Sequence, residues 1–195
     1  MHPHSELPDN REMMSASDEV LLDLALQGNS TSFGELVCRW EGRIYGFIRR
    51  YIGDSEEAKD LTQNTFTKAY VNLERLAEPA RFSSWLYKIA LNECRMRVRS
   101  RLRRPVVAIE EHVAAVERVE RTEVTPEMTL EGREKLRRLD GAFEKLPAEQ
   151  REVILMKEFQ GLRFQDIAEV LDIPLSTAKS RLYLGLKTLR RLMEE

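Results

Sequence analysis

The sequence predicts an all-α protein made of two helical domains joined by a flexible linker. Charged residues make up 33% of the 195 residues and aromatic residues only 7%, and frequent Leu, Arg, Glu and Ala suit helices. Apolar residues recur at three- and four-residue spacing, and no useful stretch has the two-residue period of a strand. We expect a disordered tail over residues 1–16, a first domain over 17–104, an acidic flexible linker over 105–129 and a second domain over 130–195.

Four helices are expected in the first domain, because each of four segments carries a single apolar stripe. Breaks are expected at Gly28-Asn29, Gly53-Asp54 and Pro105, since glycine and proline end helices. Ser30 or Thr31 should cap the second helix, and Ser55 the third. The helices should run over residues 18–26, 33–51, 55–73 and 82–102.

The second domain should also hold four helices, over residues 130–146, 148–159, 164–171 and 175–193. Breaks are expected at Pro147, at Gln160-Gly161 and at Asp172-Ile173-Pro174. The last two helices flank a tight turn, and the final one opens with small polar and basic residues. This is the layout of a helix-turn-helix, whose second helix enters the major groove of DNA with its N-terminus first.

Charge is strongly segregated along the chain, although the net charge is only −2. Residues 88–104 carry seven bases and one acid, 105–135 carry four bases and eight acids, and 176–195 carry five bases and two acids. Two basic segments separated by an acidic one suggest two nucleic-acid contacts joined by a linker. The alternative is that each basic run is only a solvated helix face.

The last helix divides into an apolar face and a polar face. Ala178, Leu182, Leu186 and Leu189 are spaced to face the protein. On the other face, Ser176 should cap the helix and leave its amides open to a phosphate. Lys179 can reach guanine, Ser180 a base or a phosphate, and Arg181 the DNA backbone. The alternative is a helical hairpin that packs on a partner protein.

Three segments resemble one family. Residues 146–161, 164–168 and 176–182 look like region 4 of bacterial RNA polymerase sigma factors, and most like the extracytoplasmic-function class. Residues 60–66 resemble the region 2 helix that docks on the polymerase β′ clamp. Residues 82–92 resemble the helix that melts and holds the −10 promoter element. The resemblance covers about 18–104 and 130–192, in the order of a minimal two-domain sigma factor.

This resemblance, together with the exposed polar and basic positions, implies three sets of binding residues. Asp60, Gln63 and Asn64 form a polar patch that could also be an ordinary solvated face, and Phe82 and Trp85 could also be core aromatics. The set for core polymerase is Asp60, Leu61, Gln63, Asn64 and Phe66. The set for the −10 element is Arg81, Phe82, Trp85, Lys88, Asn92, Arg95 and Arg99. The set for the −35 element is Lys157, Ser176, Thr177, Lys179, Ser180, Arg181 and Tyr183.

The expected function is that of an alternative sigma factor, which directs core polymerase to specific promoters and melts them. The resemblance implies contacts with the β′ clamp and β flap of the polymerase, with promoter DNA and with an anti-sigma factor. We expect no enzyme activity, cofactor or small-molecule substrate, because no acid pair, nucleophile–base set or phosphate loop is apparent. No apolar run approaches bilayer length and no secretory signal opens the chain, so we expect a cytoplasmic protein without membrane insertion.

Two other classes of function are considered. A helix-turn-helix response regulator would need a phosphoacceptor domain with strands, which the sequence does not predict. A pure protein-interaction module would not bind DNA in the presence of core polymerase. Cys38 and Cys94 are expected to be buried small apolar residues rather than a disulfide or a sensor. His2, His4 and His112 have no metal-ligand spacing with either cysteine, so no metal site is expected.

Overall fold

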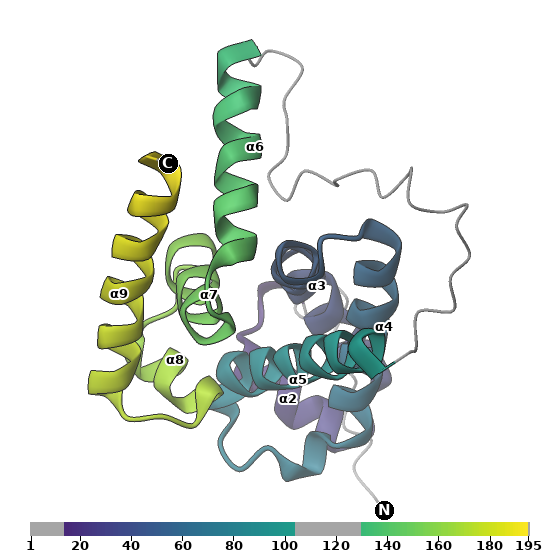
Figure 1. The fold of residues 1–195 in the computed structure, drawn as a ribbon. Helices are drawn as coiled ribbons and strands as arrows, with labels where there is room; N and C mark the ends of the chain where they lie inside the picture. Colours follow the sequence, from purple (N-terminus) through teal and green to yellow (C-terminus); the bar gives the residue numbers. More distant parts are fainter. Residues whose placement is uncertain (1–13, 104–129, 195) are drawn as a thin grey trace, which may run out of the picture.

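The structure, a computed structural model, describes residues 14–103 and 130–194, and regular secondary structure within these ranges is helical (Figure 1). The first half holds α2 (Asp18–Leu26), α3 (Ser30–Ile52), α4 (Ser55–Val71) and α5 (Phe82–Arg103), with the short η1 (Leu73–Arg75) and η2 (Pro79–Arg81) between α4 and α5. The second half holds α6 (Leu130–Lys145), α7 (Ala148–Ile154), η3 (Leu155–Phe159), α8 (Phe164–Leu171) and α9 (Leu175–Glu194). The all-α prediction is confirmed. The predicted linker and most of the predicted tail lie outside the described residues.

The helices of the first half begin at caps that differ from the predicted ones. The Asn29 side chain accepts a hydrogen bond from the Ser32 amide at 3.1 Å, and the Asp54 side chain accepts one from the Glu57 amide at 2.8 Å. The predictions of Ser30 or Thr31 and of Ser55 as caps were therefore wrong, each by one or two positions. Each cap satisfies an otherwise unpaired amide, which is worth about 1 kcal/mol.

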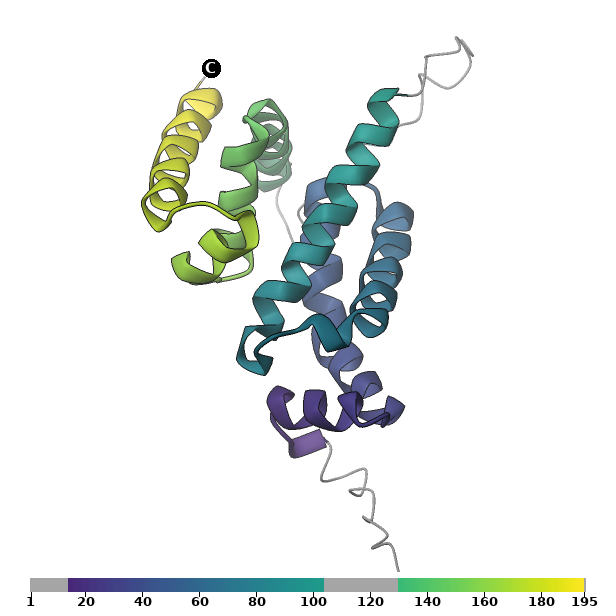
Figure 2. The same cartoon turned by 90° about the horizontal axis from the view of Figure 1, so that it is seen from below.

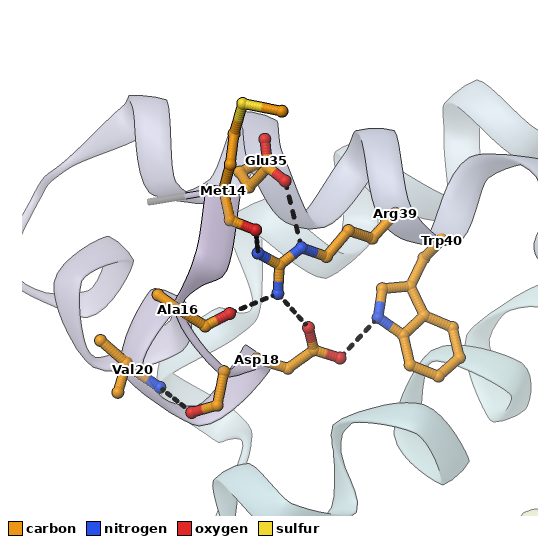
Figure 3. A network of polar contacts seen from close by, with 8 residues as sticks. Met14, Ala16, Asp18, Val20, Glu35, Arg39 and Trp40 are labelled. Carbon is orange, nitrogen blue, oxygen red and sulfur yellow. Dashed lines mark hydrogen bonds and ion pairs between the residues drawn. The ribbon is translucent and has the colours of Figure 1, made fainter. Parts of the chain in front are cut away.

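A polar network ties the start of α2 to the middle of α3 (Figure 3). The Arg39 guanidinium donates to the backbone oxygens of Met14 and Ala16 and to the carboxylates of Asp18 and Glu35, at 2.6 to 3.1 Å. Asp18 also accepts a hydrogen bond from the Trp40 indole at 2.8 Å. The chain is thus held from Met14 onward, before the end of the predicted tail at residue 16.

Trp40 connects the polar network at the start of α2 to α5. Its ring packs edge-on against Phe82, the first residue of α5, at 5.9 Å between centroids, and against Tyr87 at 6.4 Å. All three rings are buried. The start of α5, which bears Phe82 and Trp85 of the candidate −10 residues, is therefore fixed by aromatic packing onto α3.

The second half contains a π-helical turn that the sequence did not predict. The expected helix over 148–159 is an α-helix only to Ile154, and η3 follows as a π turn, in which the Gln160 amide donates to the Leu155 carbonyl at 3.2 Å. Between α8 and α9 the chain turns through Asp172, whose φ of 54° is left-handed. Asp is among the few non-glycine residues that adopt this conformation readily. The predicted helix–turn–helix is present.

α9 approaches α7 through a glycine rather than through the predicted leucine. Ala178, Leu182 and Gly185 are buried, whereas Leu186, which was predicted to face the protein, is 37% exposed. A Cβ on Gly185 would lie 2.9 Å from Ile154 Cδ1 and 3.1 Å from Gln150 Cβ. The two helices are too close at this point for a larger side chain.

Gly185→Val should therefore destabilise the second half by about 1–3 kcal/mol through overpacking. The matched control is Gly141→Val in α6, where an added Cβ meets nothing within 4 Å. Both changes put the same residue into a helix, so the difference between their thermal unfolding midpoints isolates the clash. Equal midpoints for the two variants would show that α7 and α9 are not in close contact.

The two halves pack against each other in this structure. Their buried apolar residues form one connected cluster, with α5 against α8 and α3 against η3. Figures 1 and 2 show α8 beside the start of α5 in both views. Within the described ranges, no helix is both long and apolar enough to cross a membrane.

Candidate nucleic-acid interface

The exposed face of α9 carries the expected small polar and basic residues. Ser176, Lys179 and Ser180 are exposed, Thr177 is half-buried, and Tyr183 is 67% exposed. The helix begins at Leu175, so Ser176 lies in its first turn and is not the cap that was predicted. The Ser180 hydroxyl donates to the Ser176 carbonyl at 2.9 Å, which leaves its oxygen lone pairs facing outward as acceptors.

Two lysines meet at the start of α8. The ammonium groups of Lys157 and Lys179 lie 5.1 and 5.9 Å from the centroid of the Phe164 ring. Lys157 also donates to the Leu162 carbonyl at 3.1 Å, which fixes its position. Two cations held over one ring, beside the first turn of α9, form a positive surface suited to a phosphate backbone.

Arg181 differs from its neighbours because it is paired within its own half. Its guanidinium lies 2.7 Å from the Glu149 carboxylate, and the arginine side chain is only 25% exposed. A phosphate can replace Glu149 with little loss, since partly exposed ion pairs contribute little net stability. Arg181 can therefore bind a phosphate by exchanging its ion pair with Glu149 for one with the phosphate.

A second polar track follows α5. Lys88, Asn92 and Arg99 are exposed, and their four- and seven-residue steps place them on one helix face. Trp85 is half-buried beside Phe82, at 6.2 Å between ring centroids. Phe82 itself is only 2% exposed. The prediction that Phe82 contacts DNA is not supported by this placement, because its ring is fully packed against Trp40 and Trp85.

Two other candidate −10 residues, Arg95 and Arg81, form ion pairs with glutamate side chains. Arg95 makes a bidentate pair with Glu152, with its Nε at 2.9 Å and its Nη2 at 2.6 Å from the two carboxylate oxygens. This hydrogen bonding raises the pKa of Arg95. Arg81 donates to Glu78 at 2.8 Å and lies 3.6 Å from Glu169 of α8. No local sequence pattern marks Glu152 or Glu169 as the partners of these two arginines.

The end of α5 is less available as a basic track than its sequence suggests. Arg97 and Arg101 lie 3.8 and 2.6 Å from the carboxylate of Glu57 at the start of α4. Glu93 is buried and pairs with Lys68 of α4. These pairs fasten α5 to α4, so the exposed positive charge concentrates on the face that carries Lys88 and Arg99.

α4 presents the expected polar patch. Asp60, Gln63 and Asn64 are exposed, whereas Leu61 and Phe66 are 4% and 7% exposed and belong to the core. Leu61 and Phe66 therefore support the patch from below instead of flanking it on the surface. An open pocket of about 610 Å³ adjoins the patch, and its lining includes Phe33, Val37, Gln63, Phe66 and Tyr70.

The two cysteines lie in different environments. Cys94 is fully buried, as predicted, and burial raises the pKa of its thiol. Cys38 is exposed, so the prediction that it is buried was wrong. No group of three or more His, Cys, Asp or Glu side chains gathers as a metal site within residues 14–103 and 130–194. His2, His4 and His112 lie outside the described residues.

Comparison with known proteins links both surfaces to one family. Residues 36–104 match the family described as sigma-70 region 2, and residues 136–189 match sigma-70 region 4. The chain is 30% identical to the RNA polymerase sigma-H factor of Pseudomonas aeruginosa over 170 residues, covering 85% of this chain and 88% of that protein. It is also 30% identical to the extracytoplasmic-function sigma factor SigW of Bacillus subtilis over 175 residues, covering 87% and 92%.

Solved structures agree with this relationship. CnrH in complex with the cytosolic domain of CnrY has a TM-score of 0.68 at 25% identity, covering 91% of this chain and 97% of that one. The sigma factor RpoE in complex with the anti-sigma factor NepR, from Bartonella quintana, has a TM-score of 0.65 at 22% identity, covering 83% and 96%, and shows the same fold. The chain therefore belongs to the extracytoplasmic-function class of the sigma-70 family, and it is an alternative sigma factor that directs RNA polymerase to promoters.

Proposed function

We propose that the chain divides promoter recognition between its two exposed basic faces. The α9 face, with Ser176, Lys179, Ser180 and Tyr183, reads the −35 element, and Lys157 holds the adjacent backbone. The α5 face, with Lys88, Asn92 and Arg99, holds the melted −10 strand beside the half-buried Trp85. The observation that carries this proposal is the pair of separate exposed tracks, one at a helix N-terminus and one along a helix side. These geometries suit a duplex major groove and a single strand, respectively.

We further propose that α4 docks on the β′ clamp of core polymerase. Asp60, Gln63 and Asn64 supply polar contacts on a surface that rests on a rigid core, and the neighbouring apolar pocket can receive a partner side chain. Region 4 would contact the β flap. No step of this scheme needs catalysis by the chain itself, because binding energy melts the DNA and the polymerase makes RNA.

An anti-sigma factor is proposed as a further partner, and the cytoplasm, where core polymerase works, as the location. Support for the anti-sigma factor comes from the fold shared with RpoE, whose structure holds the anti-sigma factor NepR, and from the similarity to CnrH, which was also solved with a bound partner, the cytosolic domain of CnrY. We also propose that the chain is divided into a first domain over residues 17–104, a linker over 105–129 and a second domain over 130–195.

Transcription in vitro tests the proposed function. Purified core polymerase is mixed with the chain and a library of genomic fragments, and the transcript ends are mapped. We expect a set of starts that appears only when the chain is added, with shared −35 and −10 sequences upstream. Transcripts that are the same with and without the chain would contradict the proposal.

Two lysines of the second half should affect −35 binding differently. Lys179→Ala should cost roughly 1–3 kcal/mol and relax preference at one −35 position, because a base contact is lost. Lys157→Ala should weaken binding evenly across sequences and reduce the salt slope by about one, because a phosphate contact is lost. Binding of holoenzyme to a randomised −35 library at several salt concentrations checks both. An unchanged base preference for Lys179→Ala would assign base reading to another side chain.

A further inference from the structure

A buried carboxylate joins the two halves of the chain. The Glu152 side chain, at the end of α7, is only 3% exposed. It accepts two hydrogen bonds from Arg95 of α5 and a third, at 3.0 Å, from the Tyr51 hydroxyl of α3. Burial and the neighbouring Glu152 carboxylate raise the pKa of Tyr51 to about 12, so this hydroxyl stays protonated and donates.

The side-chain hydrogen bonds that Glu152 makes with the described residues all cross between the two halves. Among the described residues, its three hydrogen bonds come from α3 and α5 of the first half. Its neighbours Val153 and Ile154 supply the core packing of α7. Glu152 is therefore not needed to form the second half, and its buried charge is satisfied only while the halves are together.

Weaker contacts surround this pair and favour the same arrangement. The Tyr87 hydroxyl donates to the Gln160 side chain at 3.0 Å. The guanidinium of Arg50 lies 5.1 Å from the centroid of the Phe159 ring. Both contacts join the first half to η3 and the residue after it, so the π turn lies at the contact between the halves.

The arginine held by Glu152 is one of the −10 residues that the sequence predicts, and it lies between Asn92 and Arg99 at helical spacing. A guanidinium binds a carboxylate and a phosphate with the same two-pronged geometry. While Arg95 holds Glu152, the Nε–Nη2 edge of its guanidinium is occupied, so a DNA phosphate cannot bind that edge. Arg81, a second predicted −10 residue, lies 3.6 Å from Glu169 of the same second half.

We propose that Glu152 is an intramolecular latch that closes the second half over α5 and occupies Arg95 until promoter DNA or polymerase separates the halves. The proposal rests on the proposed function of α5 in holding −10 DNA and on the predicted contribution of Arg95 to it. Opening exposes both Glu152 and Arg95 to water, so neither charge is left buried and unpaired, and the closed form is favoured only modestly. DNA that binds only the open form finds only the open fraction of the molecules available. The closed form therefore lowers the apparent affinity of the chain for DNA.

The test uses the full chain and two measurements. Small-angle X-ray scattering reports the radius of gyration, and fluorescence anisotropy reports binding of a labelled single-stranded oligonucleotide that carries the −10 sequence. The variant is Glu152→Gln, which keeps the shape of the side chain and removes its charge. The matched control is Glu158→Gln, which removes the same charge from an exposed position in η3.

We expect Glu152→Gln to increase the radius of gyration and to tighten oligonucleotide binding by about threefold to tenfold over Glu158→Gln. If Glu152→Gln unfolds the second half, as judged by circular dichroism, Tyr51→Phe replaces it, since that change removes only the third hydrogen bond. The same direction of change, with a smaller size, is then expected.

Three results would overturn the latch. The first is an unchanged radius of gyration in both Glu152→Gln and Tyr51→Phe. The second is a larger radius without tighter DNA binding, which would mean that closure does not cover the DNA surface. The third is equal tightening by Glu158→Gln, which would mean that net charge alone matters. Failure of the proposed function is distinguished by a separate observation, the absence of chain-dependent transcription by the unmodified protein.

Discussion

Promoter opening should be lost when Lys88, Asn92 and Arg99 are replaced together by alanine, while −35 binding persists. The three side chains form the exposed track of α5, and in the proposed function its two bases each neutralise a phosphate of the single strand. Two lost phosphate contacts should reduce the salt slope by about one to two. Together with the amide contact, we expect open complexes to fall on the order of 100-fold. Permanganate reactivity of unpaired thymines, measured with holoenzyme on a linear promoter, gives the yield of open complexes.

The control for this variant removes two bases elsewhere. Arg75→Ala with Lys145→Ala lowers the net charge equally, and both residues are exposed and far from the α5 track in sequence. Because all five positions are exposed, each substitution should change stability by no more than about 0.5 kcal/mol. Equal losses of open complex in variant and control would mean that overall charge, not the α5 track, holds the strand.

Core polymerase binding should weaken at least about tenfold when Asp60 and Gln63 are both replaced by alanine. Both side chains are exposed on one face of α4, and loss of interface contacts of a few kcal/mol is usual where polar groups meet a partner. Titration of labelled chain with core polymerase gives the dissociation constant. Glu19→Ala with Gln27→Ala likewise removes one acid and one glutamine, from exposed positions in the first turn of α2 and directly after its end, and should bind normally.

An unchanged dissociation constant for the Asp60 and Gln63 variant, with normal binding by the α2 control, would place the docking surface elsewhere. A loss in both variants would indicate a non-specific effect of charge. The pocket beside α4 suggests where the surface extends, because Gln63 and Phe66 both line it.

The helices and their order were predictable because their apolar periodicity is strong. α2, α8 and the starts of α5, α6 and α7 lie where the sequence placed them. The capping residues of α3 and α4 could not be predicted, because Ser, Thr, Asn and Asp all stabilise helix starts and two or more of them stand together before each helix. Only the observed hydrogen bonds select Asn29 and Asp54.

Other features depend on contacts that no local pattern encodes. Apolar periodicity does not mark the π turn of η3 or the close approach at Gly185, so it predicted a continuous helix and a buried Leu186 instead. Phe82 is an aromatic residue at the start of a predicted DNA-binding helix, yet its ring completes a cluster with Trp40 from an earlier helix. Composition cannot separate these two roles.

The pairing of basic side chains with acids far away in the sequence was the least predictable feature of the candidate site. Arg95 and Glu152 are 57 residues apart, and the segment between them lies partly outside the described residues. A basic run looks uniformly available in the sequence, whereas the structure places Arg95, Arg97 and Arg101 in ion pairs. The exposed candidates that remain on α5 are fewer and lie on one face.

The central claim, that the two halves act on separate promoter elements, is tested most directly by footprinting one open complex. Holoenzyme is assembled with the chain carrying a photo-crosslinker at Tyr183 of α9 or at Asn92 of α5, and crosslinked bases are mapped on a promoter found by transcription. The account predicts crosslinks from Tyr183 only to the −35 element and from Asn92 only to the melted −10 strand. Crosslinks from both positions to the same element, or from neither, would contradict it.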